Sequence, residues 1–149
     1  MTDLRELYQE VIVDHNKNPR NFHKLTACSH QAQGYNPLCG DQIALYLDIK
    51  DNKIVDVGFQ GAGCAISTAS ASLMTEIIKG KTLAEAQTLF VDFHSLVTGN
   101  EVPDKHTNIG KLTVLAGVKE YPARVKCATL AWHAFHAALQ GKQDMISTE

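Results

Sequence analysis

The chain has 149 residues, of which 44% are hydrophobic and 20% are charged, and these values predict one soluble globular domain with its own core rather than a small disulfide-stapled scaffold. Fourteen Lys and Arg residues oppose sixteen Asp and Glu residues. The resulting formal net charge of -2 at pH 7 excludes the strongly basic surface of a nonspecific DNA or RNA binder.

The first predicted element is an amphipathic helix within residues 1–18. Its apolar stripe at helical spacing consists of Leu4, Leu7, Tyr8 and Val11. The helix should end before Pro19, because the residue that precedes a proline is disfavoured in the helical conformation. Residues 27–33 show a weaker extended pattern, which predicts a short first strand.

A change to an apolar period of two after Asp41 predicts a half-buried strand. Its inward-facing residues are expected to be Ile43, Leu45, Leu47 and Ile49. A second run repeats the alternation, and its inward-facing residues are expected to be Val55, Val57 and Phe59. The segment 50–53 between them is short and rich in turn-forming residues, so the two strands should form an antiparallel hairpin.

Glycines within residues 61–63 interrupt the strand pattern, and a helix of small residues is expected to begin at Cys64 and to end at Gly80. Thr82 and Glu85 form a capping box, which predicts the start of another helix.

The remaining patterns are also helical. A short helix is expected over residues 112–116. Pro122 stands where a proline in the first turn of a helix would stand, and it opens a last helix that Gly141 ends. The predicted order is a helix, two or three antiparallel strands and several helices, which is typical of the α+β class.

The start of the chain lacks the features of a secretory signal peptide, because residues 1–15 carry an acidic or basic side chain every few positions. The longest uncharged stretch, residues 57–75, is too rich in glycine, serine and threonine to enter a bilayer. We therefore expect a cytoplasmic protein that binds neither membrane nor nucleic acid. In the cytoplasm thiols stay reduced, and cysteines more often bind metal or react than form disulfides.

Three of the four cysteines stand in local settings that suit a thiolate, and Cys39 and Cys64 are the first two. Cys39 lies in a turn-rich segment, and Asp41, two positions later, can turn its carboxylate toward the same centre. Cys64 is expected in the first turn of a helix, where free N–H groups and the positive end of the helix dipole stabilise a thiolate.

Cys127 has a comparable setting near the start of the last helix, beside the cations Arg124 and Lys126. Three thiolates and one carboxylate would satisfy tetrahedral Zn²⁺ or iron without a histidine. The cysteines are, however, far apart and lack the short CxxC pairs of a zinc ribbon, and free cysteines are often small core residues. From these residues alone, a shared site and a core role both remain open.

The fourth cysteine, Cys28, matches no ligand pattern and is interpreted as a half-buried small residue. The histidines are scattered along the chain, and we interpret them as ordinary surface residues. They are His15, His23, His30, His94, His106, His133 and His136.

A series of short motifs runs along most of the chain. In order they are Pro19-Arg20-Asn21, Pro37-Leu38-Cys39-Gly40-Asp41, Gly63-Cys64-Ala65-Ile66-Ser67, Ala69-Ser70-Ala71-Ser72, Lys79-Gly80-Lys81 and Pro122-Ala123-Arg124-Val125-Lys126-Cys127-Ala128-Thr129-Leu130. With these motifs the chain resembles the NifU N-terminal/IscU/SufU family of iron–sulfur cluster assembly proteins over residues 4–139. The resemblance implies one SufU/IscU-like domain over residues 1–149. Its SufE/NifU-like α+β fold would place a small antiparallel sheet of about three strands against several helices, after an N-terminal helix.

Within that family the chain looks most like the SufU branch. IscU-type members carry a histidine immediately before the third cysteine, whereas this chain has Lys126. Residues 100–121 resemble the insertion that SufU-type members carry ahead of that cysteine. Residues 142–149 are expected to form a flexible tail.

The resemblance also implies a metal site and a partner. The residues that would bind Zn²⁺ tetrahedrally are Cys39, Asp41, Cys64 and Cys127. Cys39 would be the catalytic residue that accepts sulfur from the persulfide of a SufS-type cysteine desulfurase, after a desulfurase side chain takes its place on the metal. The sulfur would pass to downstream iron–sulfur assembly proteins or apo targets. Arg124 and Lys126 would stabilise anionic sulfur or steer an acidic partner, unless they form only a solvated helix start.

Other functions stay open. The same residues would serve a scaffold on which a transient 2Fe–2S cluster or iron is held by Cys39, Cys64 and Cys127, with Asp41 aiding its release. Such a scaffold would not be an enzyme, whereas a sulfurtransferase would be. A purely structural zinc site is a third candidate, and a Cys–His hydrolase is a remote fourth, because no His–Asp pair stands out to activate a thiol. Lys126 and the insertion favour the sulfurtransferase.

Overall fold

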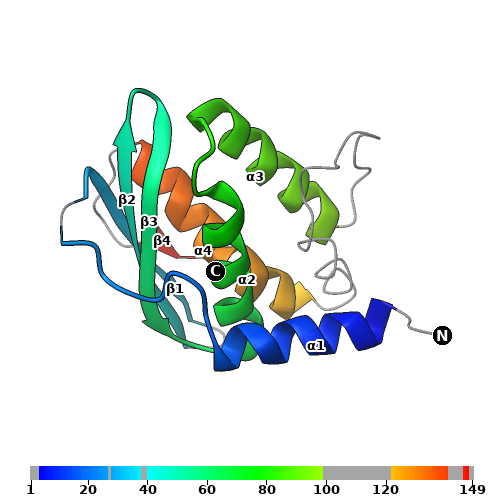
Figure 1. Ribbon diagram of the computed structural model, residues 1–149. Coiled ribbons are helices and arrows are strands. Elements are labelled where there is room, and N and C mark those ends of the chain that lie inside the picture. Colours follow the sequence, from blue (N-terminus) through cyan, green and yellow to red (C-terminus); the bar gives the residue numbers. More distant parts are fainter. Residues whose placement is uncertain (1–3, 27, 38–39, 99–121, 141–145, 148–149) are drawn as a thin grey trace.

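Four helices and a small sheet make up the part of the chain that the computed structural model describes, residues 4–26, 28–37, 40–98, 122–140 and 146–147 (Figure 1). In chain order the elements are α1 (Leu4–Lys17), β1 (His30–Asn36), β2 (Asp41–Lys50), β3 (Lys53–Ala62), α2 (Ala65–Ile78), α3 (Leu83–Thr98), α4 (Pro122–Leu139) and β4 (Ile146–Ser147). The predicted α+β class and the N-terminal helix are confirmed.

The sheet has the strand order β3-β2-β1-β4, and its strand pairs are antiparallel except for the short pair between β1 and β4. The hairpin predicted between β2 and β3 is confirmed. At its tip Asp51 and Asn52 have φ angles of 53° and 61°. Two successive positive φ values give a hairpin turn the twist that the flanking strands need.

The predicted inward face of β3 is wrong at its first position. Ile54 is fully buried, whereas Val55 is 39% exposed. Asp48 of β2 pairs with Asp56. The next residue, Ile49, pairs with Ile54, so Val55 is the extra residue of a bulge. An extra residue shifts the alternation by one position, and this shift turns Ile54 toward the core.

Two strand boundaries also differ from the prediction. The first strand lies at His30–Asn36, later in the chain than the weak pattern over residues 27–33 suggested. The strand β3 continues to Ala62, because its backbone stays paired with β2 beyond the point where glycine ends the apolar pattern. Backbone pairing thus carries both strands toward the same end of the sheet, where β2 begins at Asp41.

Helices cover one face of the sheet. The helix α4 packs against β1 and β2, and α2 packs against β3 and against α4. The helices α1 and α3 lie outside this pair, α1 against α2 and α3 against α4 (Figure 1). The largest fully buried side chains are Trp132, Phe93, Phe135, Leu45, Leu47, Ile54, Met74, Ile78 and Leu130.

The helix α1 ends at Lys17, as predicted, but its buried face includes a histidine. Ile12 and His15 are buried, and Val11 is half-buried. The expectation that His15 lies on the surface is therefore wrong. Its Nδ1 lies 2.6 Å from the hydroxyl oxygen of Ser72, and the small side chains of α2 let α1 approach closely enough to cover the ring.

The predicted boundaries of α2 and the predicted start of α3 are confirmed. Cys64 is the N-cap of α2, and Gly80, with a φ of 87°, follows its C-terminal end. In the capping box, the backbone N–H of Thr82 donates to Glu85 at 3.0 Å, and the backbone N–H of Glu85 donates to Thr82 at 3.2 Å. The hydrogen bonds that the Glu85 carboxylate receives from the backbone and the side chain of Thr82 lower the pKa of Glu85.

The helix α4 begins at Pro122, as predicted. The short helix predicted over residues 112–116 and the insertion over residues 100–121 lie outside the described residues. No helix in the described ranges is both long and apolar enough to span a bilayer.

A flexible tail was predicted over residues 142–149, but the two of these residues that the structure describes form a strand. Ile146 and Ser147 form β4, which pairs in parallel with Gly34 and Tyr35 of β1. This pairing covers the edge of β1 that β2 does not use, and a covered edge exposes fewer unpaired backbone groups.

Candidate metal centre

Three of the four predicted ligands converge at the end of the sheet where β2 begins. They are Asp41 from β2, Cys64 at the start of α2 and Cys127 from α4, and one ligand atom of each lies within 4.8 Å of the others. Within the described ranges this is the only group of three or more His, Cys, Asp or Glu residues arranged closely enough to hold a metal ion. The fourth predicted ligand, Cys39, lies outside the described residues.

Asp41 joins the sheet to α2. It is fully buried, and its Oδ1 accepts a hydrogen bond from the backbone N–H of Cys64 at 2.7 Å. Gly63 makes this approach feasible, since a Cβ at that position would lie 2.6 Å from Oδ1 of Asp41. The carboxylate is therefore fixed by the backbone on one side, and its Oδ2 points toward the two thiols.

Cys64 caps the helix α2 with its side chain. Its Sγ accepts a hydrogen bond from the backbone N–H of Ser67 at 3.4 Å, which satisfies one of the free donors of the first turn. The same sulfur lies 3.9 Å from Oδ2 of Asp41. The prediction that Cys64 stands at a helix N-terminus is confirmed.

Cys127 sits deeper in its helix than the sequence suggested. α4 begins at Pro122, so Cys127 lies beyond the first turn, where the field of the helix dipole has already weakened. The residue is fully buried. Arg124 is exposed and Lys126 is half-buried, and among the described residues neither side chain forms a hydrogen bond or ion pair with the three ligands.

Asn36 is a contact residue that the sequence analysis missed. It ends β1, is fully buried and pairs directly with Asp41 across the strands. Its amide nitrogen lies 3.2 Å from Oδ2 of Asp41 and 3.4 Å from Sγ of Cys127. The missing signal was the pairing register of β1 with β2, because it places Asn36 opposite the predicted ligand Asp41.

The chemistry of these donors fits a tetrahedral zinc or iron ion. Zinc takes thiolate sulfur at about 2.3 Å and carboxylate oxygen at about 2.0–2.2 Å, so two ligands on one ion lie about 3.6 Å apart. The 3.9 Å between Cys64 and Asp41 is close to that value. Three donors leave one tetrahedral position, and Cys39 stands two residues before Asp41 in the sequence.

A second cluster of titratable residues lies between α3 and α4, away from the three ligands. The rings of His94 and His133 are 6.0 Å apart, and Phe90 contacts both of them as well as His136. Burial lowers the pKa of His133, and His94 and His136 lower it further by charge repulsion. The expectation of ordinary surface histidines therefore fails for His133. Cys28 is half-buried, as predicted, and is not part of the ligand group.

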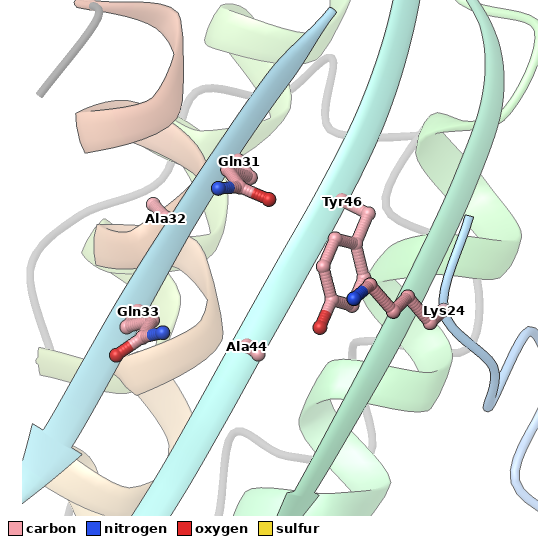
Figure 2. A pocket seen from close by; sticks show the side chains of 6 residues that line it. All are labelled: Lys24, Gln31, Ala32, Gln33, Ala44 and Tyr46. Atoms are coloured by element: carbon pink, nitrogen blue, oxygen red, sulfur yellow. The ribbon is translucent and has the colours of Figure 1, made fainter. Parts of the chain in front are cut away.

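A pocket of about 200 Å³ opens on β1 and β2. Figure 2 shows Gln31 and Gln33 on β1 beside Ala44 and Tyr46 on β2, with Lys24 reaching over Tyr46. The lining amides, phenol and amine include no thiol or carboxylate. This pocket lacks the donors for the predicted metal and sulfur chemistry.

The part of the chain that matches known proteins includes the three ligands. The model of the NifU-like N terminal domain family matches residues 7–140. The zinc-dependent sulfurtransferase SufU of Bacillus subtilis (strain 168) is 43% identical over 132 residues, which cover 89% of this chain and 88% of that protein. The iron-sulfur cluster assembly scaffold protein IscU of Streptococcus pyogenes serotype M1 is 41% identical over 140 residues, which cover 94% of this chain and 87% of that protein.

The fold is also similar to that of a solved structure. The crystal structure of FiSufU from the thermophile Fervidobacterium islandicum AW-1 superposes with a TM-score of 0.84 at 38% identity, covering 89% of this chain and 96% of that one. Relatives named SufU and IscU are about equally similar to the chain, so sequence identity alone does not choose between their functions.

Proposed function

The chain belongs to the NifU/IscU/SufU family of iron–sulfur cluster assembly proteins, and on that premise we propose that it is a zinc-dependent sulfur acceptor for a SufS-type cysteine desulfurase. In this proposal Cys39 receives the sulfur and shares the zinc ion with Asp41, Cys64 and Cys127. The observation that carries the proposal is the convergence of the latter three donors within 4.8 Å.

Two features of the sequence support sulfur transfer over a scaffold. Lys126 stands where IscU-type members carry a histidine before the third cysteine, and residues 100–121 resemble the insertion that SufU-type members carry ahead of that cysteine. A zinc-dependent sulfurtransferase is also among the similar proteins, at 43% identity. Arg124 is exposed near the same helix end, where a cation would meet an acidic surface of the desulfurase.

The transfer to Cys39 needs no external oxidant or reductant. The Cys39 thiolate attacks the outer sulfur of the desulfurase persulfide, and a new S–S bond forms on Cys39. The S–S bond of the desulfurase breaks, and its electron pair leaves with the desulfurase cysteine thiolate. A bound zinc ion would keep the coordinating thiols deprotonated at neutral pH.

The test combines metal analysis with a sulfide-release assay. We expect the purified protein to contain zinc and to accelerate cysteine-dependent sulfide release by a SufS-type desulfurase. Cys39→Ala should abolish this acceleration, and mass spectrometry should find the persulfide on Cys39 of the unmodified protein. Cys28→Ala is the matched control and should accelerate normally. Full acceleration by Cys39→Ala would contradict the assignment of the acceptor.

A second candidate function is a scaffold for a transient 2Fe–2S cluster. The relative that is 41% identical is named a scaffold protein, and thiolates with a carboxylate suit iron as well as zinc. Cys39, Cys64 and Cys127 would then be the cluster ligands. A brown, oxygen-sensitive preparation that contains iron and acid-labile sulfide in place of zinc would favour the scaffold.

Both candidate functions share the same location and recipients. We propose that residues 1–149 act as one domain in the cytoplasm and deliver sulfur or cluster to downstream iron–sulfur assembly proteins or apo targets.

Arg124 and Lys126 are proposed to help the desulfurase dock. A pull-down that recovers a cysteine desulfurase from cell extract only with Arg124 and Lys126 intact would support this auxiliary role. Equal recovery with Arg124→Ala and Lys126→Ala would contradict that role.

A further inference from the structure

We infer that Asn36 is a positioning residue of the metal centre, whose amide clamps Asp41 to Cys127. The inference rests on the proposed metal site and adds to it a residue that is not a ligand. Asn36, at the end of β1, joins β2 to α4 through one –NH₂ group, because that group reaches Asp41 and Cys127.

The geometry gives the amide two acceptors. Its nitrogen lies 3.2 Å from Oδ2 of Asp41 and 3.4 Å from Sγ of Cys127, and all three residues are fully buried. An amide –NH₂ has two hydrogens, one for each acceptor. A carboxylate and a thiolate both accept and cannot donate, so the nitrogen rather than the oxygen of the amide must face them.

When Asp41 and Cys127 serve as metal ligands, the Asn36 amide donates to a carboxylate and to a thiolate, which are both negatively charged. A buried carboxylate and a buried thiolate repel each other, and a shared donor offsets that repulsion by hydrogen bonding to both. Asn36 is held opposite Asp41 by the β1–β2 register, so the donor is in place before a metal arrives. Outer contacts of this kind orient metal ligands and typically change metal affinity by about 10–100-fold.

Among the described residues, two further hydrogen bonds to Asp41 and Cys64 come from the backbone. The N–H of Cys64 donates to Asp41, and the N–H of Ser67 donates to Cys64. A side-chain substitution leaves these two hydrogen bonds in place. The clamp at Asn36 can therefore be removed without changing a ligand or the cap of α2.

The experiment uses the full chain loaded with Zn²⁺ or, for spectroscopy, with Co²⁺. The two variants are Asn36→Ala, which removes the amide, and Asn36→Leu, which fills its volume without a donor. We expect zinc release to a chelating dye to be about tenfold faster in both variants. We also expect the sulfur-to-cobalt charge-transfer band to move to lower energy, because Cys127 loses a hydrogen bond that withdraws electron density from its sulfur.

Ser70→Ala is the matched structural control. The Ser70 hydroxyl is fully buried and donates to the carbonyl oxygen of Ala128 at 2.5 Å, so its loss breaks a polar contact between α2 and α4 without touching a ligand. This variant should keep the zinc release rate and the cobalt spectrum of the unmodified protein.

The outcomes separate this inference from the proposed function. Unchanged release and an unchanged spectrum in both Asn36 variants would overturn the clamp while leaving the metal centre intact. Equal acceleration by Ser70→Ala would also overturn it, because the effect would then be general loosening. An unmodified protein without a cobalt–thiolate spectrum would overturn the metal centre and the clamp together.

Discussion

Gly63 sets how closely the start of α2 approaches the carboxylate of Asp41. A Cβ on this residue would lie 2.6 Å from Oδ1 and 3.0 Å from Cβ of Asp41. Contacts this short force one partner to move, and a shift of Asp41 would disturb the hydrogen bonds that its carboxylate accepts from Cys64 and Asn36. The residue therefore matters for the site although it offers no ligand atom.

Gly63→Ala should weaken metal binding about tenfold, because it displaces a ligand by a small distance. It should also lower the free energy of unfolding by about 1–3 kcal/mol through overpacking. Chelator competition and urea denaturation would measure the two effects.

The control for Gly63→Ala is Gly80→Ala. Gly80 has a φ of 87°, and a Cβ there would meet no atom within 4 Å. We expect a loss of about 1 kcal/mol from backbone strain and an unchanged metal affinity. If Gly80→Ala weakened metal binding as much as Gly63→Ala, general instability rather than ligand displacement would be the cause.

At the scale of elements, α2 depends on Cys64 in two ways. The thiol is a predicted ligand, and it also caps the helix by accepting from the N–H of Ser67. A hydroxyl can take over the cap but is a poor ligand for zinc, so the two roles can be separated by substitution.

In metal-free protein, Cys64→Ser should keep the unfolding free energy of the unmodified chain, whereas Cys64→Ala should lose about 1 kcal/mol with the cap. Both variants should fail to retain zinc. Urea denaturation with excess chelator measures the first effect, and metal analysis measures the second. Equal stability of the two variants would show that the sulfur does not act as a cap.

The contact between α3 and α4 should make stability depend on pH. The pKa of His133 is lowered from its ordinary value of 6.5 by burial and by His94 and His136. The unfolded chain therefore binds a proton first as the pH falls below about 6.5, and the folded state loses stability from there down to the lowered pKa. Below that pKa the loss is complete.

His133→Gln should remove this part of the pH dependence. The slope that His133 adds should stay below about 1.4 kcal/mol per pH unit, since one proton is involved and the ring is only partly buried. Urea denaturation of both proteins from neutral to acidic pH, with excess chelator to exclude metal release, measures the difference. Identical pH profiles would contradict the assignment to His133.

The elements differ in how well the sequence predicts them. The apolar period gave β2, and the capping box at Thr82 and Glu85 gave the start of α3, because both signals are local. The bulge that buries Ile54 was missed, because it depends on how two strands pair. The strand β4 was missed for the same reason, since two residues at Ile146–Ser147 carry no periodicity and form a strand only by pairing with β1.

At the scale of the whole molecule, the metal centre ties together three elements from distant parts of the chain. Local settings and family resemblance predicted Asp41, Cys64 and Cys127 as ligands, but spacing alone could not show that they meet. Their meeting depends on α2 and α4 packing against each other and against the sheet. Asn36 escaped prediction because its role exists only when β1, β2 and α4 are assembled.

Metal binding should therefore stabilise the complete fold. An ion that binds only the folded state at a hundredfold excess over its dissociation constant adds about 2.7 kcal/mol, which corresponds to about 5–10 °C in Tm for a domain of this size. We expect calorimetry to show such a rise when zinc is added to metal-free protein.

Cys64→Ser is the control for this shift, because it retains the cap and lacks the thiolate. Its Tm should not respond to zinc or to chelator. A zinc-dependent rise in Cys64→Ser as large as that of the unmodified chain would place the stabilising ion elsewhere.

The single tryptophan gives the folded protein a built-in optical reporter. Trp132 is fully buried in α4, and its ring stacks on Phe93 of α3 with centroids 5.0 Å apart. Its indole N–H has no hydrogen-bond partner among the described residues, and an indole without water or polar partners fluoresces at short wavelength. All tryptophan emission therefore comes from one helix–helix junction. A red shift on titration or heating would report exposure of this junction to water, as when α3 separates from α4.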